Sequence, residues 1–321
     1  MKSASSSLLN GLAGHVRSFL GDRPWASTLL RTLACRQYPF QFHLRSLVLI
    51  FFSRPSITKE IHKNLLFNRD PALTAFADKI ASKKFGEELG IRVPETFAAW
   101  ESAEDIELKL APRNLVIKAT HGSGMTIVIS ESLPRGGKLD VNVSAAIRRI
   151  HPDDIDLEDL KSIAGAWLAT KYGQLPGQVP EWAYVAVPRR LIAEELLGNG
   201  VAAPIDYRFV CVHGRLRLVA IASGRHGELR TIHLNRDFEV IQLNWSAAPE
   251  NRAPDIGSIP IFVLEKMRAY AEQISARQTI LRVDFYFVNE EIVLGELTNY
   301  PQAGRARFRP RKYDRTLLRH S

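Results

Sequence analysis

Three pairs of short apolar segments, each pair joined by a tight turn or a glycine loop, constrain the fold of this chain more than any other feature. Segments of this length that are rich in Val, Ile, Leu and Phe are typical of β-strands, and short connections between them favour antiparallel hairpins. The pairs are residues 114–119 with 126–129, 206–212 with 215–221, and 280–288 with 292–297.

The segments between these pairs add helices and single strands. We expect helices over about 78–85, 143–172 and 261–275, because apolar residues recur there at helical spacing. Strands are expected over 91–94 and 190–197. The sequence therefore predicts the α+β class with mostly antiparallel sheet.

Basic residues are concentrated at the two ends of the chain. The net charge is +9, yet residues 1–69 hold about ten Lys and Arg against two acids, and residues 301–321 hold about seven against one. Such ends suit lipid headgroups, phosphate-rich glycans or nucleic acid, and solvated ends are the alternative. The longest apolar run, 47–52, is too short to span a bilayer, and two cysteines make no disulfide framework. We therefore expect a cytoplasmic protein.

The change of pattern along the chain predicts its domain organisation. Residues 1–69 read as short helices interrupted by prolines and are expected to form an accessory segment. From residue 70 the pattern changes to helices and strands, which are expected to form the main domain over 70–315 with a division near 190–200. Residues 316–321 are predicted to be a basic tail.

The turn of the last hairpin decides which of its residues face each other. A three-residue connection centred on Glu290 would place Asp284 opposite Glu296 and Tyr286 opposite Leu294. Opposed carboxylates are destabilising unless a cation lies between them, and oxygen ligands favour Mg²⁺, with Mn²⁺ as the alternative. A two-residue turn would instead slip the register and leave the two acids unrelated.

A glycine loop follows the strand that ends near Lys118. The loop, His121, Gly122, Ser123 and Gly124, could bring backbone N–H groups close to phosphate oxygens, and Lys118 could meet the same phosphates. Because no GK[ST] sequence and no helix follow, the loop is not a Walker loop. The alternative for Lys118 is a lysine that extends to solvent from a strand end.

Four further charged residues occupy apolar strands. Glu194 and Glu195 precede a Gly-Asn-Gly break, where they could lie beside the adenine and ribose of a nucleotide or form an exposed strand end. Arg208 and Arg282 each need a carboxylate or phosphate partner, because an unpaired charge inside a sheet is costly.

Taken in order, these pieces resemble the ATP-grasp superfamily, and specifically its TupA-like branch, which acts in teichuronopeptide biosynthesis. The resemblance covers about residues 70–315 and implies the ATP-grasp fold, in which two α+β subdomains clasp ATP, here with an N-terminal helical extension. The matching segments are 78–79, 115–126, 192–195, 206–209, 282–286 and 295–298.

The resemblance implies a role for each matching residue. Lys79, Lys118, the loop from His121 to Gly124, and Glu194 with Glu195 would bind ATP; Asp284 and Glu296 would hold magnesium; Arg208 and Arg282 would stabilise the transferring phosphoryl group. The family places a third metal ligand, an asparagine, where this chain has Thr298. Asn299 is one residue further on, and on an extended strand it could coordinate only through a bulge or a turn.

The activity implied is an ATP- and Mg-dependent ligase that joins a carboxylate donor to an amine acceptor through an acyl phosphate, in bacterial cell-surface polysaccharide biosynthesis. The donor or acceptor would be a glycan or a glycan precursor. The alternatives are a phosphotransferase acting on a sugar and a non-catalytic glycan-binding protein. No zinc, helix-turn-helix or RNP pattern indicates a nucleic-acid partner, whereas the basic ends suit peripheral contact with a membrane.

Overall fold

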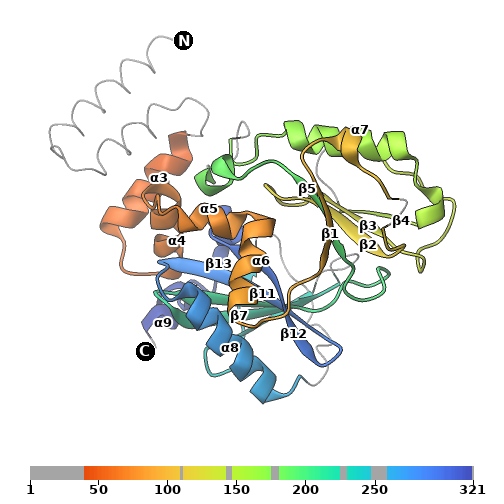
Figure 1. Cartoon of the computed structure of the whole chain (residues 1–321). Helices are drawn as coiled ribbons and strands as arrows, with labels where there is room; N and C mark the ends of the chain where they lie inside the picture. The colour runs from red at the N-terminus through yellow and green to blue at the C-terminus, as the bar shows by residue number, and fades with distance from the viewer. Residues whose placement is uncertain are drawn as a thin grey trace, which may run out of the picture.

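The computed structural model describes residues 40–108, 111–141, 147–174, 181–224, 230–246 and 259–319. Two separate sheets dominate this part of the chain, one built before residue 196 and the other after residue 205 (Figure 1).

The first sheet has five strands and one helical cover. Its spatial order is β1 (Thr96–Trp100), β5 (Leu191–Glu195), β2 (Leu115–Ala119), β3 (Thr126–Ile129) and β4 (Ile147–Ile150). All neighbours are antiparallel except β3 and β4. Helix α7 (Leu157–Ala169) covers one face and buries Leu160, Ile163 and Trp167 in the same cluster as Ile117 and Ile127. The opposite face is therefore left for other contacts.

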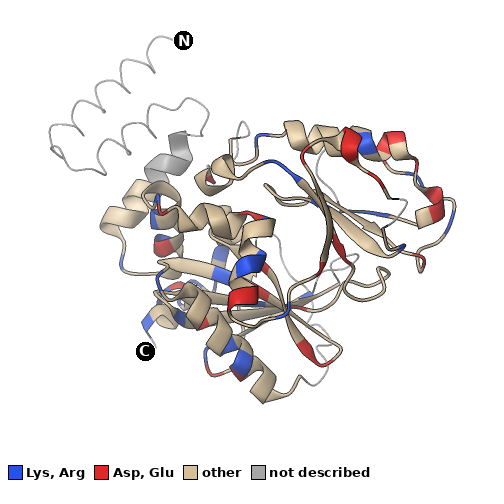
Figure 2. Ribbon diagram, in the orientation of Figure 1, with Lys and Arg blue, Asp and Glu red and all other residues tan. Residues whose placement is uncertain are grey.

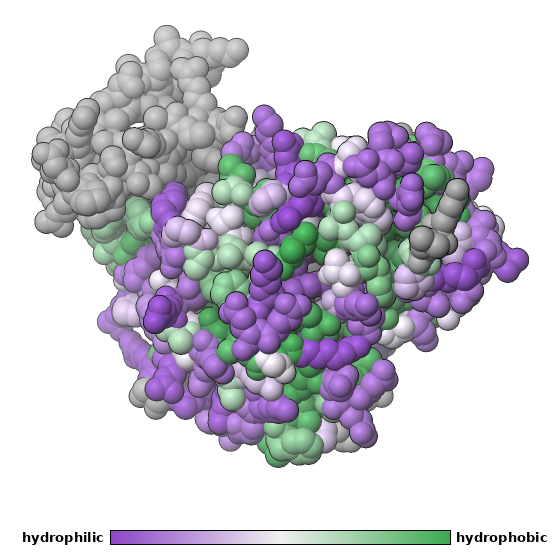
Figure 3. All heavy atoms as spheres, in the orientation of Figure 1, coloured by the Kyte–Doolittle hydropathy of each residue, from purple (hydrophilic) through white to green (hydrophobic). Residues whose placement is uncertain are grey.

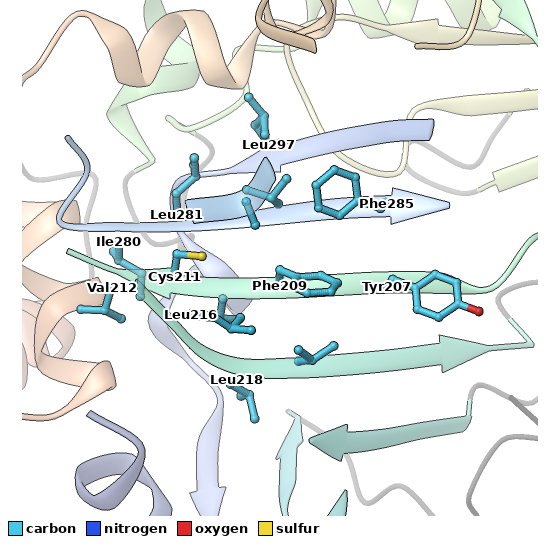
Figure 4. Close-up of a cluster of buried hydrophobic side chains, with 14 of the residues drawn as sticks. Tyr207, Phe209, Cys211, Val212, Leu216, Leu218, Ile280, Leu281, Phe285 and Leu297 are labelled. Carbon is cyan, nitrogen blue, oxygen red and sulfur yellow. The ribbon is translucent and has the colours of Figure 1, made fainter. Parts of the chain in front are cut away.

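The second sheet has six antiparallel strands. Its order is β12 (Glu291–Thr298), β11 (Ile280–Val288), β6 (Asp206–Val212), β7 (Arg215–Ser223), β8 (Arg230–Leu234) and β9 (Val240–Ile241). Phe209 and Phe285 belong to a large apolar cluster (Figure 4). The same cluster contains Val283 and Met267 of helix α8 (Ile261–Ser275). Because side chains alternate along a strand, the charged residues between these apolar ones lie on the other face.

Short helices and 3-10 turns complete the described fold. The helices are α3 (Phe40–Phe52), α4 (Ile57–Leu66), α5 (Ala72–Ala77), α6 (Lys79–Glu88) and α9 (Tyr313–Arg319). The 3-10 turns are η1 (Ala103–Asp105), η2 (Pro152–Asp154), η3 (Trp182–Ala186) and η4 (Pro301–Gly304), and β10 (Asn244–Ser246) pairs with β13 (Arg307–Arg309). No helix within these described residues is both long and apolar enough to cross a bilayer.

The predicted class and most predicted elements are confirmed, and two are wrong. Residues 91–94 form no strand: they make one isolated bridge, from Arg92 to Val293. The strand in this part of the chain is β1, which begins only at Thr96. The stretch predicted as one helix over 143–172 contains strand β4 before α7. Buried Arg148 and Ile150 alternate there with exposed neighbours, which is the strand period.

Both ends of the described chain are more closely integrated than the sequence suggests. Ile57, Ile61 and Leu65 of α4 lie in the core of the second sheet, so this part of the expected accessory segment is built into the main body. The prediction of a basic tail over 316–321 is wrong for residues 316–319, because they belong to α9, whose Leu317 is buried in that core. Residues 1–39, also part of the expected accessory segment, lie outside the described residues.

Candidate functional site

The β11–β12 hairpin brings two carboxylates opposite each other by a route that the sequence did not indicate. Asn289 and Glu290, both at positive φ, form a two-residue turn that pairs Val288 with Glu291. A one-residue register shift at Gly295 then restores Asp284 opposite Glu296. The pairing is confirmed, whereas the three-residue turn and the pairing of Tyr286 with Leu294 are wrong, since Tyr286 pairs with Val293.

Gly295 makes this register shift possible. A Cβ at residue 295 would lie 2.6 Å from the ring of Tyr286 and 3.2 Å from the backbone oxygen of Asp284. Only glycine lets the Tyr286 ring lie over the bulge, so the residue type at 295 and the alignment of the two acids are linked.

Arg282 compensates part of the charge of the carboxylate pair. Its guanidinium donates to both oxygens of Asp284, at 2.7 and 2.6 Å. Burial raises the pKa of Asp284 and Glu296 adds to the rise, while Arg282 opposes both. Burial alone would lower the pKa of Arg282, but Asp284 and Glu296 more than offset it, so this arginine stays charged.

Arg208 is the second arginine on the same face. Its guanidinium donates to Asp206 at 3.0 Å, and its backbone lies opposite Asp284 across the β6–β11 ladder. Both predicted arginines therefore have carboxylate partners, as the cost of burying an unpaired charge requires. The Arg208 Nε atom is buried and has no hydrogen-bond partner in the described residues, so it retains a donor for an anion.

The first sheet contributes a second buried ion cluster. Glu194 lies between Lys118, in direct contact, and Lys83, at 2.8 Å. Burial alone would raise the pKa of Glu194, but the two lysines lower it below the ordinary value, so the carboxylate is charged. Lys118 is thus no freely solvated strand-end lysine in this structure.

An apolar cleft lies beside this cluster and is lined from both sheets. Val116, Lys118 and Val128 contribute from the first sheet, while Tyr286 and Gly295 contribute from the second. Glu194, Glu195 and the following residues 196–197 line the side where the chain crosses between the sheets. A flat apolar ring can be enclosed here, with lysine and glutamate charges at its edge.

Glu195 is held outside the ion cluster. Its carboxylate accepts from Arg92 at 2.5 Å and from the backbone N–H of Glu95 at 3.3 Å. Both glutamates at the end of β5 therefore have defined partners, and neither is a loose strand end.

Lys79 connects the cleft with the carboxylate pair. It begins α6, which Asp78 caps, and its Nζ donates to the carbonyl oxygen of Gly122 at 2.5 Å. Burial lowers the pKa of Lys79, and the charges of Glu296, Lys118 and Glu194 act on it as well. Lys79 therefore lies within electrostatic reach of both acidic clusters.

The glycine loop lies between these clusters and a pair of tyrosines. Gly124 has a φ of +78°, which explains the second glycine. A Cβ on Gly122 would lie 3.0 Å from the ring of Tyr172, and the Tyr172 hydroxyl is hydrogen-bonded to Ser123. His121 points away from the loop, because its Nε2 contacts the Trp167 carbonyl oxygen at 3.0 Å and its side chain is buried.

The ring of His121 is therefore directed toward α7, and contact of this residue with ATP stays a prediction. Burial lowers its pKa, and the carbonyl of Trp167 opposes that shift. The ring is neutral at pH 7 and packs the loop against α7.

Asn299 follows β12 and is fixed from both sides. Its side-chain amide donates to the carbonyl of Leu73 at 2.6 Å, and its own carbonyl accepts from Asn64 at 3.0 Å. Its Oδ1 is buried without a hydrogen-bond partner in the described residues. The contacts given for Asn299 are to the helices and not to Asp284 or Glu296, so its role as a ligand stays a prediction. The described residues contain no group of three or more His, Cys, Asp or Glu side chains placed to hold a metal.

Three site residues were missed from the sequence. Tyr172, Glu181 and Tyr184 lie within electrostatic reach of Glu296, and the two tyrosine rings contact each other with centroids 5.0 Å apart. Burial raises the pKa of Glu181 to about 7, Arg305 opposes the rise and Glu296 adds to it. Their only sequence signal is a Tyr-Gly pair and an isolated acid in an irregular stretch, which no motif marks.

Comparison with solved structures finds ligases of low sequence identity. D-alanine–D-alanine ligase from Bacillus anthracis, complexed with ATP, is 15% identical over 71% of this chain and 55% of its own, with a TM-score of 0.37. D-alanyl-alanine synthetase A from Vibrio cholerae is 13% identical over 73% and 57%, with a TM-score of 0.39. An ADP complex of N5-carboxyaminoimidazole ribonucleotide synthetase is 13% identical over 71% and 46%, with a TM-score of 0.36.

This chain spans about half the length of these solved structures. No curated protein matches its sequence. The sequence model of one protein family, TupA-like ATP-grasp, matches residues 59–319. That match runs from α4 to the end of α9 and includes both sheets, the glycine loop and the carboxylate hairpin. The chain therefore belongs to the TupA-like ATP-grasp family and has the α+β fold of that family.

Proposed function

We propose that this protein is an ATP- and Mg-dependent ligase that activates a carboxylate as an acyl phosphate and joins it to an amine. One observation carries the proposal: an apolar cleft, a lysine cluster and a carboxylate pair follow one another between the two sheets. The cleft with Lys118 and Glu194 is connected through Lys79 to Glu296 and Asp284. This order suits a base, a phosphate chain and a metal ion.

The cleft would hold the adenine and the lysines would hold the phosphates. Val116 and Val128 offer apolar surface to a flat base, and Glu195 lies at the rim where a ribose would be placed. Lys118 lines the cleft, and Lys79 donates to the glycine loop at the carbonyl of Gly122. A lysine ammonium serves phosphate as a compact point charge.

Asp284 and Glu296 would hold the magnesium ion. Burial raises the pKa of Asp284, and the opposed Glu296 adds to that rise. Two opposed carboxylates of this kind fit a hard divalent cation. The orphaned Oδ1 of Asn299 is a further oxygen of the preferred type. When bound, the ion would neutralise charge on the phosphates of ATP.

The two arginines would act on the transferred phosphoryl group. A donor carboxylate oxygen attacks the γ-phosphorus, the bond to ADP breaks, and an acyl phosphate forms. The amine then attacks the acyl carbon, phosphate leaves, and the amine loses a proton as the amide forms. Arg282 and Arg208 offer fixed positive charge beside the site of transfer, where electrostatic positioning contributes most.

The donor and acceptor would belong to cell-surface polysaccharide assembly in bacteria. Membership of the TupA-like family supports this assignment. A carboxylate-bearing glycan precursor and an amine are the reactants that this chemistry needs, and the reaction would take place in the cytoplasm, where ATP is supplied.

Trapping with hydroxylamine tests the proposal without knowledge of the natural acceptor. Hydroxylamine converts an acyl phosphate to a hydroxamate, so a panel of amino acids and uronic acids should give ATP-dependent hydroxamate and ADP in equal amounts. Arg282→Lys keeps the charge but loses the bidentate geometry, and should slow hydroxamate formation by about 100-fold. If a phosphorylated sugar forms and no hydroxamate is detected, the protein is a phosphotransferase instead. If none of the reactants causes ATP to be consumed, the protein is a non-catalytic binding protein.

A further inference from the structure

The chain carries an exposed basic strip along β13 and α9, toward its C-terminus; Figure 2 marks the basic residues along the ribbon. Six exposed cations lie along β13 and α9, and none of them has a carboxylate partner among the described residues: Arg307, Arg309, Arg311, Lys312, Arg315 and Arg319. The one acid in this stretch, Asp314, already accepts from the backbone N–H and the hydroxyl of Thr58. The positive charge of the strip is therefore not balanced locally.

The strip also has a concave part. Arg307, Arg311, Lys312 and Arg315 line one groove together with Phe308. Asp314 also lines this groove, so four cations face one acid there, and that acid accepts from Thr58. The excess of cations concentrates positive potential in the groove, and such a surface attracts anionic groups.

An exposed apolar helix face lies at the same edge. Val48, Phe51 and Phe52 are 52, 51 and 85% exposed, and their spacing places them on one face of α3. The 13 residues of α3 include no acid. Helix α4 packs against both α3 and α9, so the apolar face and the basic strip flank one helix. Figure 3 shows hydrophobic side chains at this edge of the molecule.

The combination favours one kind of partner. A soluble polyanion would pair with the cations but would leave Val48 and Phe52 exposed to water, whereas an anionic bilayer offers partners to both. Apolar side chains that enter the headgroup boundary and nearby Lys and Arg are typical of interfacial binding. The described residues contain no membrane-spanning helix, and surface docking needs none.

We propose that the α3–α4–α9 edge docks on a membrane surface rich in anionic lipid, with Val48 and Phe52 entering the interface and the basic strip meeting the headgroups. The cleft lined by Val116 and Tyr286 lies elsewhere, between the sheets, and stays accessible. The proposal does not depend on the reaction that the cleft supports.

Vesicle sedimentation of the full chain tests the proposal. The protein should pellet with vesicles of equal parts phosphatidylglycerol and phosphatidylcholine, and should stay in solution with phosphatidylcholine alone. Arg311→Glu/Lys312→Glu/Arg315→Glu should lower the partition coefficient more than about tenfold, and Phe52→Ser roughly tenfold. The matched control Lys84→Glu/Lys138→Glu/Lys266→Glu makes the same charge change at exposed positions elsewhere and should stay within about twofold of wild type.

Three results would overturn the proposal. The first is absence of binding to the anionic vesicles, or equal binding by the two triple variants. The second is tight binding of soluble poly-L-glutamate that Phe52→Ser leaves unchanged, which would assign the strip to a polyanion. The third is a dimer by light scattering that Phe52→Ser dissociates, which would assign α3 to a second copy of this chain. Circular dichroism of each variant confirms that it is folded.

Discussion

At the scale of single residues, the pairing of Arg282 with Asp284 is the feature on which the site depends most. Both side chains are largely buried and joined by two hydrogen bonds. Arg282→Met would leave Asp284 buried without its counter-charge, so we expect a loss of about 3–5 kcal/mol in the free energy of unfolding. Denaturant titration measures this loss.

The double variant Arg282→Met/Asp284→Leu removes the orphaned charge as well. It should recover most of that loss, because replacing both partners of a buried pair by apolar groups is often close to neutral. If the double variant is no more stable than Arg282→Met alone, the interaction between these two residues is not what stabilises this part of the sheet.

Glu181 makes the stability of the protein depend on pH. Burial raises its pKa to about 7 from the ordinary value of 4.5, so the folded chain holds a proton that the unfolded chain releases between these two values. The contribution of Glu181 to the free energy of unfolding is fully present below about pH 4.5 and is lost as the pH rises through about 7. Glu181→Gln should therefore be more stable than wild type at pH 8, by up to about 3 kcal/mol.

Thermal unfolding of both proteins at pH 5 and pH 8 measures this difference. The gain from Glu181→Gln should shrink toward zero at pH 5, where the wild-type carboxyl is also protonated. A gain of the same size at both pH values would point to a packing effect instead of the loss of a buried charge.

Individual site residues could be predicted from the sequence where charge interrupts an apolar strand. Asp284, Glu194 and Arg208 stand out in this way, and the structure gives each a partner. His121 was predicted as a phosphate contact because it stands beside two glycines, but the sequence does not show that its ring turns toward Trp167. Glu181 lies in an irregular stretch, where no periodicity indicates burial.

At the scale of elements, the turn of the last hairpin carries measurable strain. Glu290 has a φ of +64° in a two-residue turn, a region that costs a non-glycine residue about 1 kcal/mol. Glu290→Gly should therefore stabilise the protein by roughly 0.5–1 kcal/mol, because it forms the Asn-Gly sequence that such turns prefer. Chemical unfolding measures the change, and Glu107→Gly, at an exposed position outside any helix or strand, serves as control.

The junction of α4 and α9 should contribute to stability through Asp314. Its Oδ1 accepts from the backbone N–H of Thr58 at 2.8 Å and from the Thr58 hydroxyl at 2.9 Å. Asp314→Ala should cost about 1–3 kcal/mol in the free energy of unfolding, since it leaves a first-turn donor of α4 without its partner. Glu107→Ala is a matched exposed control, and equal losses in both variants would argue against a specific junction.

The elements that could be predicted are those in which the spacing of apolar residues shows the strand or the helix over the whole segment. Strands β2, β3, β6 and β11 are apolar runs between turn residues, and α8 shows helical spacing over its whole length. Strand β4 was missed because two of its four residues are arginines, although one of these is buried. Helix α9 was read as a tail because its one buried residue, Leu317, is outnumbered by basic neighbours.

At the scale of the whole molecule, the candidate site exists only where the two sheets meet. The first sheet supplies Lys118 and Glu194, the second supplies Asp284 and Glu296, and Lys79 lies within reach of both clusters. Sequence order could suggest these contributors, yet the Asp284–Glu296 alignment depends on a bulge at Gly295 that compensates a shorter turn. The prediction had a turn that was one residue too long and no bulge, and these two errors cancelled. The alignment of the two acids was therefore right while the turn was wrong.

The central claim is that this junction binds ATP with magnesium through Asp284 and Glu296, and isothermal titration of ATP with and without Mg²⁺ tests it most directly. Wild type should bind ATP at least about tenfold more tightly with Mg²⁺, and Asp284→Asn/Glu296→Gln should lose that gain. The control Glu107→Gln/Glu290→Gln also removes two acids, both exposed and neither placed in the site, and should bind like wild type. Equal Mg²⁺-dependent binding by the Asp284/Glu296 variant and wild type, or no binding of ATP by either, would contradict the account.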